Sequence, residues 1–326
     1  MSDFIVRAEC PCCQSKKFTE LYKCSFLSKP IKDTINSYSE KENIFNVLND
    51  SKYVLLKCIN CYAIFQKEIL NDFYVEKLYS TWISPKEEYQ IDMNRDIDFQ
   101  LFYLQELLAV MSYFNKVPKE IKVLDHAIGW GQFYSVAKSF GFDTYGTEIS
   151  PKKIEHATSN NFKLLNINNL KDYSFDFINT EQIFEHLSNP IETLLTLTNS
   201  LNQNGIIKVS VPTPSNSLEK AVKNVTEQDA KKFLAGKILN PVYPLEHINC
   251  FRKKSITEMC RIAGLKQVKI PLSFIFRPSL FTFNTFKKYF FRVVFKPCYR
   301  FKSCILTNLI INCFRLKSNY MFFKKV

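Results

Sequence analysis

The fold class rests on the segment VLDHAIGWGQF, residues 123–133. It joins a short apolar run, Val123-Leu124, to a helix-compatible run that begins at Gln132, through a turn that contains Gly129 and Gly131. Glycine in such a turn permits positive φ and lets a ligand approach the backbone, and the helix N-terminus that follows offers free N–H groups. With only 7 glycines in 326 residues, two in one turn carry more information than they would in a glycine-rich chain.

Strand-like and helix-like segments alternate around this turn. The sequence predicts strands at 144–149, 162–165, 175–179 and 206–211, and helices at 99–114, 132–140, 152–159 and 190–201. This alternation predicts an α/β fold with a doubly wound, Rossmann-like parallel sheet. Ligands of such sheets bind at the edge where the carboxyl ends of the strands meet.

An acidic residue stands at the end of the second predicted strand. A carboxylate at the position of Glu148 can accept hydrogen bonds from both hydroxyls of a ribose. The turn and this acid together predict a site for an adenosine-containing cofactor. A nicotinamide-type domain and a non-binding α/β domain with two chance glycines are the alternatives.

Four segments in order resemble the class I S-adenosylmethionine-dependent methyltransferases. They are VLDHAIGWGQF, TYGTEIS (144–150), FDFINTEQIFEHL (175–187) and NQNGIIKVSVP (202–212), and the resemblance extends over roughly residues 120–265. It implies S-adenosylmethionine as the cofactor. The implied binding residues are Asp125, Gly129 and Gly131 at the methionine end, Glu148 and Ile149 at the ribose, Asn166 beside the adenine, and Thr180 and Glu181 closing the pocket.

Ala127 departs from the family pattern, because it stands where the first motif has a glycine. An alanine fits there if its φ stays negative, and otherwise its methyl group crowds the cofactor site. A non-catalytic Rossmann-like scaffold with a degenerate cofactor site is therefore one alternative function.

Two CxxC pairs near the start of the chain predict a metal site. Cys10/Cys13 and Cys58/Cys61 can present four thiolates to a structural Zn²⁺, which stabilises a domain too small to have much core. The arrangement resembles the N-terminal zinc-binding module of some sugar and natural-product methyltransferases. Redox-active or inert thiols are the alternative, and Cys12 is a substitute ligand. Cys24, Cys250, Cys260, Cys298, Cys304 and Cys313 have no such pairing and are expected to be small buried residues.

Methyl transfer to an acceptor of high pKa needs a base that removes a proton. The chain has only four histidines, and two of them follow predicted strands. Glu185 and His186 follow the fourth strand, where they act on the acceptor or simply cap and pack a helix. His247 lies in PLEHIN (244–249), which resembles a segment after the fifth strand in this family, and it serves as a base, an acceptor contact or a structural histidine.

The net charge of +13 is concentrated at the C-terminal end. Residues 271–326 contain eleven Lys or Arg and no Asp or Glu, together with many aromatic residues, so the rest of the chain is nearly neutral. Basic residues among aromatics suit an anionic membrane surface. Contact with single-stranded RNA and an ordinary packed or partner-docking segment are the alternatives.

The sequence shows no signal peptide and no membrane-spanning run, so the cytoplasm is the expected compartment, with peripheral attachment at the inner membrane face through the C-terminal extension. The predicted order is a zinc-ribbon-like module (1–70), a helical connector (71–118), a methyltransferase domain (119–270) with an acceptor-covering insertion (212–245), and a basic aromatic extension (271–326).

The expected acceptor is a small molecule or saccharide, such as a sugar, a nucleotide-sugar or a lipid-linked glycan in polysaccharide biosynthesis. An RNA methyltransferase is the enzymatic alternative, although nucleic acid is not the expected partner. The oligomeric state stays open.

Overall fold

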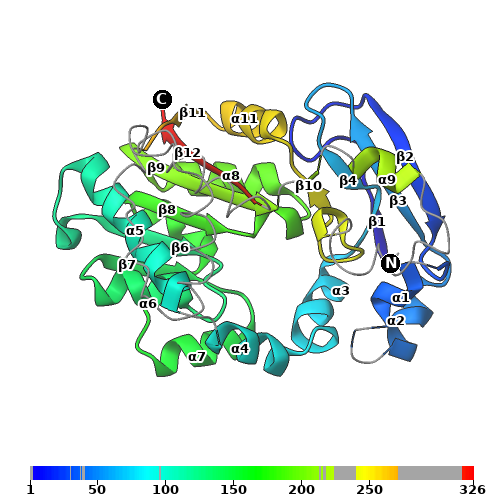
Figure 1. Ribbon diagram of the computed structural model, residues 1–326, viewed down its shortest axis with the longest axis horizontal. Coiled ribbons are helices and arrows are strands. Elements are labelled where there is room, and N and C mark those ends of the chain that lie inside the picture. Colours follow the sequence, from blue (N-terminus) through cyan, green and yellow to red (C-terminus); the bar gives the residue numbers. More distant parts are fainter. Residues whose placement is uncertain are drawn as a thin grey trace, which may run out of the picture.

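The chain forms two lobes, which we call the N-terminal module and the sheet domain (Figure 1). The computed structural model describes residues 3–29, 31–36, 38, 41–94, 97–212, 214–215, 218–223, 240–270 and 318–326. Most of the predicted insertion at 212–245 and most of the basic aromatic extension lie outside the described residues, as do Cys298, Cys304 and Cys313. Within the described residues, no helix combines the length and the apolar character needed to cross a bilayer.

The sheet domain contains a six-stranded mixed sheet with the order β11-β12-β9-β8-β6-β7. Its strands are β6 (Lys122–His126), β7 (Asp143–Thr147), β8 (Phe175–Glu181), β9 (Leu201–Pro212), β11 (Leu265–Val268) and β12 (Ser318–Lys325). The first four are parallel, and β12 is antiparallel to both of its neighbours. The predicted Rossmann-like α/β fold is confirmed.

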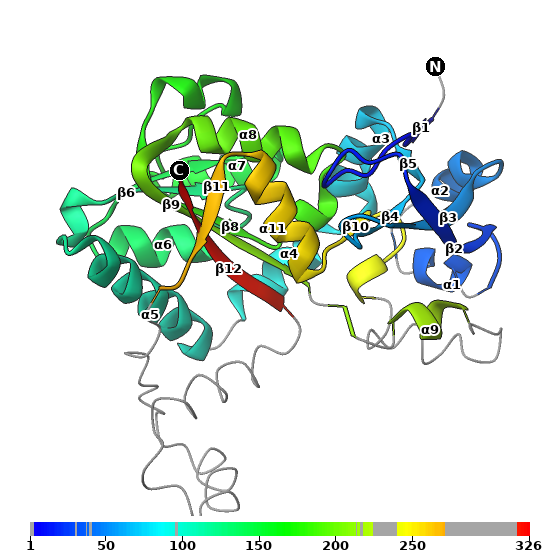
Figure 2. The same cartoon turned by 90° about the horizontal axis from the view of Figure 1, so that it is seen from above.

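Helices cover both faces of this sheet (Figure 2). They are α5 (Ile97–Phe114) and α6 (Gln132–Ser139) on one face, and α8 (Pro190–Asn199) and α11 (Lys253–Ile262) on the other. Because successive strand residues point to opposite faces, Val123 and Phe177 pack with α5 and α6, whereas Leu124 and Ile178 pack with α8 and α11. The strands that are covered on both sides are accordingly mostly apolar at their centres, although β9 also buries Lys208 there.

Local sequence determines where several helices begin. In α8, the Asn189 side chain caps the helix by accepting from the backbone N–H of Glu192, and Pro190 occupies the first turn. A Ser-Pro pair starts α4 (Pro85–Met93) and another starts α7 (Pro151–Ser159). Short 3₁₀ helices occupy η2 (Pro118–Glu120), η3 (Ile167–Asp172) and η4 (Phe184–His186).

Two predicted segments of the sheet domain differ from the structure. Residues 162–165 form no regular strand, and only an isolated parallel bridge joins Leu164 to Gly146. The segment is short because Asn166, immediately after it, already caps η3. Residues 318–325, predicted to belong to an extension beyond the methyltransferase domain, instead form β12 between β9 and β11 (Figure 2). The predicted domain end at residue 270 therefore leaves out an inner strand.

The N-terminal module is built on a four-stranded antiparallel sheet with the order β10-β4-β3-β2. Its strands are β2 (Phe18–Ser25), β3 (Lys52–Cys58), β4 (Ile64–Gln66) and β10 (Asn249–Cys250), and beside them lies the pair β1 (Phe4–Val6) and β5 (Glu68–Leu70). Between the CxxC pairs, α1 (Ile31–Ile35) and α2 (Lys41–Leu48) pack Ile31 and Leu48 into the core. Because β10 lies late in the chain, the N-terminal module includes residues from far beyond the predicted range 1–70.

The connector between the lobes is helical. It consists of α3 (Asp72–Lys77), a π-helical turn η1 (Leu78–Trp82), α4 and α5. The described parts of the predicted insertion, α9 (Leu218–Lys223) and η6 (Asn240–Val242), place Leu218 and Val242 in the core of the N-terminal module. This insertion therefore packs, where described, on the lobe opposite the glycine turn.

Candidate active site

The turn after β6 contains three residues with positive φ. The φ angle is 55° at Ala127, 57° at Gly129 and 79° at Gly131. Glycine adopts this region readily, whereas an L-residue with a Cβ costs about 1 to 2 kcal/mol there. The condition under which an alanine fits this position, a negative φ, is therefore not met. The backbone N–H of Ala127 donates to Thr147 Oγ1 at 3.1 Å, which holds the turn against β7.

The carboxylate of Glu148 lies against this turn. Its Oε2 accepts from Gly129 N at 3.0 Å, and its Oε1 accepts from Ile149 N at 2.8 Å and from Ser150 N at 2.9 Å. Three backbone donors therefore fix the direction of the carboxylate, and Oε2 keeps acceptor capacity for a ligand hydroxyl. The side chain of Ile149 is 82% exposed beside it and offers an apolar surface to a flat ring.

The open side of the turn is at Gly129. A Cβ built on Gly129 meets no atom within 4 Å, whereas one built on Gly131 lies 2.3 Å from the Phe162 ring. A side chain at position 131 would collide with the Phe162 ring, so packing requires a glycine there. At Gly129 the backbone is uncovered, and a ligand can approach it. An open backbone beside a fixed carboxylate fits the ribose and methionine parts of S-adenosylmethionine.

Helix α4 forms a wall beside the turn. Glu88 of α4 pairs with Lys153 of α7 at 3.1 Å, and the ring of Tyr89 packs edge-on against Trp130 with centroids 4.9 Å apart. These two contacts hold the helical connector between the lobes close to the residues around Gly129. A cofactor in the turn would lie between the sheet edge and this helix.

The other residues implied in cofactor binding lie deeper or further away. Asp125 is buried and accepts from Asn179 Nδ2 at 2.7 Å, and burial raises the pKa of its carboxyl to about 7. Thr180 is fully buried and donates to Lys208 O, so its hydroxyl faces the sheet. Asn166 is exposed, and its side chain caps η3 by accepting from the backbone N–H of Asn168.

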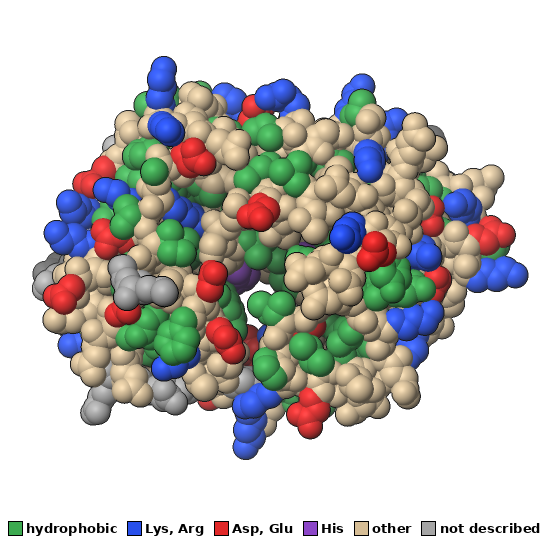
Figure 3. Space-filling model, turned by 180° about the vertical axis from the view of Figure 1, so that it is seen from behind, with side chains coloured by type: hydrophobic (Ala, Val, Ile, Leu, Met, Phe, Trp, Pro, Cys, Tyr) green, Lys and Arg blue, Asp and Glu red, His purple; other side chains and the backbone are tan. Residues whose placement is uncertain are grey.

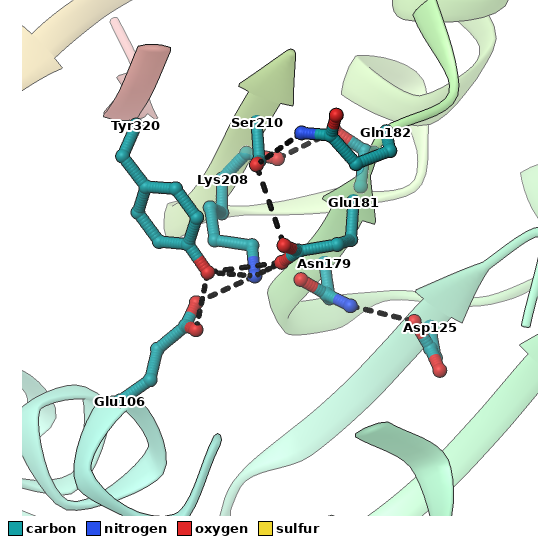
Figure 4. Close-up of polar contacts among 9 residues, drawn as sticks. Glu106, Asp125, Asn179, Glu181, Gln182, Lys208, Ser210 and Tyr320 are labelled. Carbon is teal, nitrogen blue, oxygen red and sulfur yellow. Dashed lines mark hydrogen bonds and ion pairs between the residues drawn. The ribbon is translucent and has the colours of Figure 1, made fainter. Parts of the chain in front are cut away.

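Glu181 belongs to a buried polar network that the sequence did not predict (Figure 4). The side chain of Lys208 on β9 is fully buried, and its Nζ lies 2.8 Å from Glu106 Oε1 and 2.6 Å from Glu181 Oε2. The Tyr320 hydroxyl from β12 lies 2.7 Å from Lys208 Nζ, 2.7 Å from Glu106 Oε2 and 2.9 Å from Glu181 Oε2. Four elements thus meet at one ammonium group near the carboxyl edge of the sheet.

Glu185, His186 and His247 converge although His247 lies far along the chain. Their nearest ligand-type atoms all lie within 4.8 Å of one another, and the two imidazole centroids are 4.8 Å apart. Glu185 and His186 stand in η4, directly after β8, and His247 precedes β10. Because β8 neighbours β6, this cluster lies along the same sheet edge as the glycine turn.

Burial controls the charge states in this cluster. It raises the pKa of Glu185 to about 8, and both carboxyl oxygens lack a hydrogen-bond partner among the described residues. Burial, with a smaller contribution from His247, lowers the pKa of His186 to about 3. At neutral pH, Glu185 is therefore protonated and the His186 imidazole is uncharged.

Residues missed by the sequence reasoning orient the imidazole of His186. His186 Nδ1 lies 2.8 Å from the hydroxyl of Tyr79, in η1, and 3.0 Å from Glu246 O. The Glu246 carboxyl accepts from the Tyr38 hydroxyl of the N-terminal module. Glu246 was part of the PLEHIN segment, but no local pattern marked Tyr79 or Tyr38. A space-filling view shows a hollow between the lobes with a histidine side chain in its wall (Figure 3).

The four predicted metal ligands gather at one point of the N-terminal module. The Sγ atoms of Cys10, Cys13, Cys58 and Cys61 all lie within 4.8 Å of one another, with Cys10 and Cys61 3.5 Å apart and Cys13 and Cys58 3.6 Å apart. Four thiols at these separations suit tetrahedral Zn²⁺. Cys12 is completely buried and is not a member of this group.

Comparison with solved structures finds methyltransferases of low identity. The plantazolicin methyltransferase BamL, solved with a triazolic desmethylPZN analog and SAH, is 16% identical with a TM-score of 0.46, over 74% of this chain and 90% of that one. BpumL, a plantazolicin methyltransferase solved with SAH, is 17% identical with a TM-score of 0.45, over 77% and 94%. A SAM-dependent methyltransferase from Archaeoglobus fulgidus is 14% identical with a TM-score of 0.37, over 68% and 94%. No curated protein sequence matches the chain.

The family comparison covers the part of the chain that carries the glycine turn, Glu148 and both histidines of the cluster. The profile of a family described as "methyltransferase domain" matches residues 98–270. This segment is more than half of the 326 residues. The protein therefore belongs to the methyltransferase-domain family.

Proposed function

We propose that this enzyme methylates a small molecule of the saccharide class in the hollow between its lobes. The cluster of Glu185, His186 and His247 is the observation that supports the proposal most, because it supplies an uncharged imidazole at the edge of the sheet that bears the cofactor turn. S-adenosylmethionine supplies an electrophilic methyl group on a sulfonium. When bound, this cofactor would supply the methyl group to the acceptor, and an imidazole of the cluster would take the proton that the acceptor loses.

The cofactor would be held by the turn and the acid that follows β7. Gly129 offers an open backbone, Glu148 a fixed carboxylate and Ile149 an exposed apolar side chain. This combination counts against the alternative of a degenerate, non-binding scaffold. The positive φ of Ala127 strains the turn but leaves the space at Gly129 open.

A saccharide acceptor is supported by the hydrogen-bonding groups near the histidines. Tyr79 and Glu246 contact His186 directly, and Tyr38 contacts Glu246. Hydroxyl, carboxyl and imidazole groups together suit a ligand rich in hydroxyls. A nucleotide-sugar or a lipid-linked glycan remains within this proposal. No described contact favours RNA as the acceptor.

The test of cofactor binding is calorimetric titration with S-adenosylhomocysteine. Glu148→Ala is expected to weaken binding at least tenfold, because it removes the carboxylate that would accept the ribose hydroxyls, whereas Glu155→Ala on the surface of α7 should not. Absence of binding to the unchanged protein would restore the scaffold alternative.

The test of the acid–base role uses labelled cofactor and a panel of sugars and nucleotide-sugars, with the mass shift of the acceptor as the readout. His247→Gln and His186→Gln are expected to lower turnover by roughly 10² to 10⁴-fold while S-adenosylhomocysteine still binds. Glu155→Gln, at an exposed position of α7, is the control. Full turnover in both cluster variants would contradict a base at this site.

We also propose that Cys10, Cys13, Cys58 and Cys61 bind a structural zinc ion. The mutual approach of their Sγ atoms supports this assignment. Cys58→Ser is expected to lower the zinc content and to destabilise the N-terminal module, and Cys24→Ser, outside the group, should do neither. Unchanged zinc in Cys58→Ser would remove the proposal.

A further inference from the structure

The two histidines of the cluster are carried by different lobes. His186 follows β8 of the main sheet, whereas His247 directly precedes β10, which is an edge strand of the N-terminal sheet. β10 pairs with β4 with Asn249 opposite Phe65, and Gln66 N donates to Ile248 O at 3.0 Å. The separation of the two imidazoles thus depends on how the lobes are joined at this point.

One arginine of the N-terminal module reaches both histidine-bearing segments. Arg7 follows β1 and is only 8% exposed. Its Nη1 donates to Asn249 Oδ1 at 2.7 Å and to Ile248 O at 3.3 Å, and its Nη2 donates to Ser188 O at 3.1 Å and Leu187 O at 3.4 Å. The guanidinium therefore touches the segment after His247 with one nitrogen and the segment after His186 with the other.

Asn249 makes the complementary connection. Its side chain is buried, and its Nδ2 donates to Phe184 O at 2.9 Å and to Leu187 O at 2.7 Å while its Oδ1 accepts from Arg7. Phe184 and Leu187 enclose Glu185 and His186 in sequence. The Asn249 side-chain amide thus donates both of its N–H groups to the segment that carries His186, and its oxygen accepts from Arg7.

We propose that Arg7 and Asn249 are positioning residues that hold His186 and His247 in register, an inference that rests on the proposed acid–base role of the cluster. The chemistry of both side chains supports the assignment. Arg7 forms no ion pair within the described residues, so its charge is stabilised by neutral oxygens in a planar fork, a geometry that lysine does not reproduce. Asn249 needs both a donor and an acceptor, so an aspartate of equal size would lose the link to Phe184 and Leu187.

The same contacts link the proposed zinc site to the histidines. Cys10 lies three residues after Arg7, and β4 follows Cys61 closely. The folded Cys10 to Cys61 cluster therefore fixes the backbone from which Arg7 and Gln66 reach toward the active site. The N-terminal module then positions His247 as well as adding stability.

The test records imidazole ¹H–¹³C NMR signals of the full-length protein labelled at histidine. Replacement of each histidine by glutamine assigns the signals of His126, His156, His186 and His247. The variants Arg7→Lys and Asn249→Asp each keep side-chain size and remove one part of the clamp. Arg252→Met is the matched control, since the Arg252 guanidinium pairs with Glu219 and, among the described residues, forms no hydrogen bond to residues 184–188.

In Arg7→Lys and Asn249→Asp, the signals of His186 and His247 are expected to move and the protonation midpoint of His186 to rise, because its buried position loosens. The signals of His126 and His156 and the affinity for S-adenosylhomocysteine should stay as in the unchanged protein. The proposal is overturned if the His186 and His247 signals do not move, if all four histidines move alike, or if both variants unfold, since each result indicates a purely structural link between lobes. These signals do not require turnover, so failure of the proposed function and failure of the clamp are distinguishable.

Discussion

At Ala127, local sequence and backbone conformation disagree. The sequence places an alanine where the chain turns with a φ of 55°. Its Cβ strains a conformation that glycine adopts without cost, so Ala127→Gly is expected to stabilise the fold by about 1 kcal/mol. Urea unfolding measures the change. Ala109→Gly, in the middle of α5, is the control and should instead destabilise by about 1 kcal/mol; a loss of stability in Ala127→Gly would show that the strain is absent.

Glu185 gives the protein a measurable dependence of stability on pH. Its folded pKa of about 8 lies above the ordinary value of 4.5. Between these two values the unfolded chain releases the proton and the folded chain keeps it, so the free energy of unfolding falls as pH rises from about 4.5 to 8. Glu185→Gln removes this term. The variant should match the unchanged protein near pH 4 and exceed it by a few kcal/mol at pH 9, whereas Glu155→Gln should follow the unchanged protein throughout; identical curves for Glu185→Gln would contradict a buried, protonated carboxyl.

Local motifs identified some site residues and missed others for a physical reason. The turn with Gly129 and the acid at Glu148 are neighbours across adjacent strands, and spacing along the chain is enough to suggest their contact. Tyr79 reaches His186 and Arg7 reaches the segments that carry both histidines, each from a separate element, and nothing in the local sequence of Tyr79 or Arg7 records that approach. The sequence suggested Glu185, His186 and His247 one by one, and only the fold brings them together.

Among the elements, β12 is the one whose role depends most on residues distant in sequence. Its side chains pack on both faces, Phe322 with α5 and α6 and Phe323 with α8 and α11. Such a strand has no polar alternation, so the sequence grouped it with the basic aromatic residues before it. The strands and helices of residues 122–212 were predicted well. Their apolar residues recur with the period of a strand or a helix, and each element packs beside its neighbour in the sequence.

Tyr320 connects β12 to the buried Lys208. Tyr320→Phe removes a hydroxyl that contacts Lys208, Glu106 and Glu181, and the three charged groups then lose a partner inside the protein. The expected cost is about 1 to 3 kcal/mol in the free energy of unfolding. Tyr145→Phe is the control, because no hydrogen bond of the Tyr145 hydroxyl occurs within the described residues, and it should cost less than about 0.5 kcal/mol. Equal effects of the two substitutions would contradict a stabilising network around Lys208.

For the whole molecule, the position of β12 changes how the basic aromatic residues can be studied. Truncation after residue 270 would remove an inner strand together with them. Replacing residues 272–317 with a short Gly/Ser linker keeps β12. A short linker is enough because β11 and β12 are antiparallel neighbours, with Val268 opposite Phe322, so the two chain ends that it joins lie close together. Flotation with anionic liposomes is expected to retain the full chain and to lose the deletion variant at moderate salt, because nine basic residues between 271 and 317 are removed. Equal flotation of both proteins would contradict the expectation that the basic aromatic extension contacts a membrane.

The order of synthesis of the sheet strands also differs from their order in space. When β9 leaves the ribosome, the strand that will cover its open edge has not been translated, and it appears only after residues 213–317. An uncovered, apolar strand edge can pair with another nascent chain in the interval. Expression at low temperature or with a chaperone that shields such edges should therefore raise the yield of native enzyme.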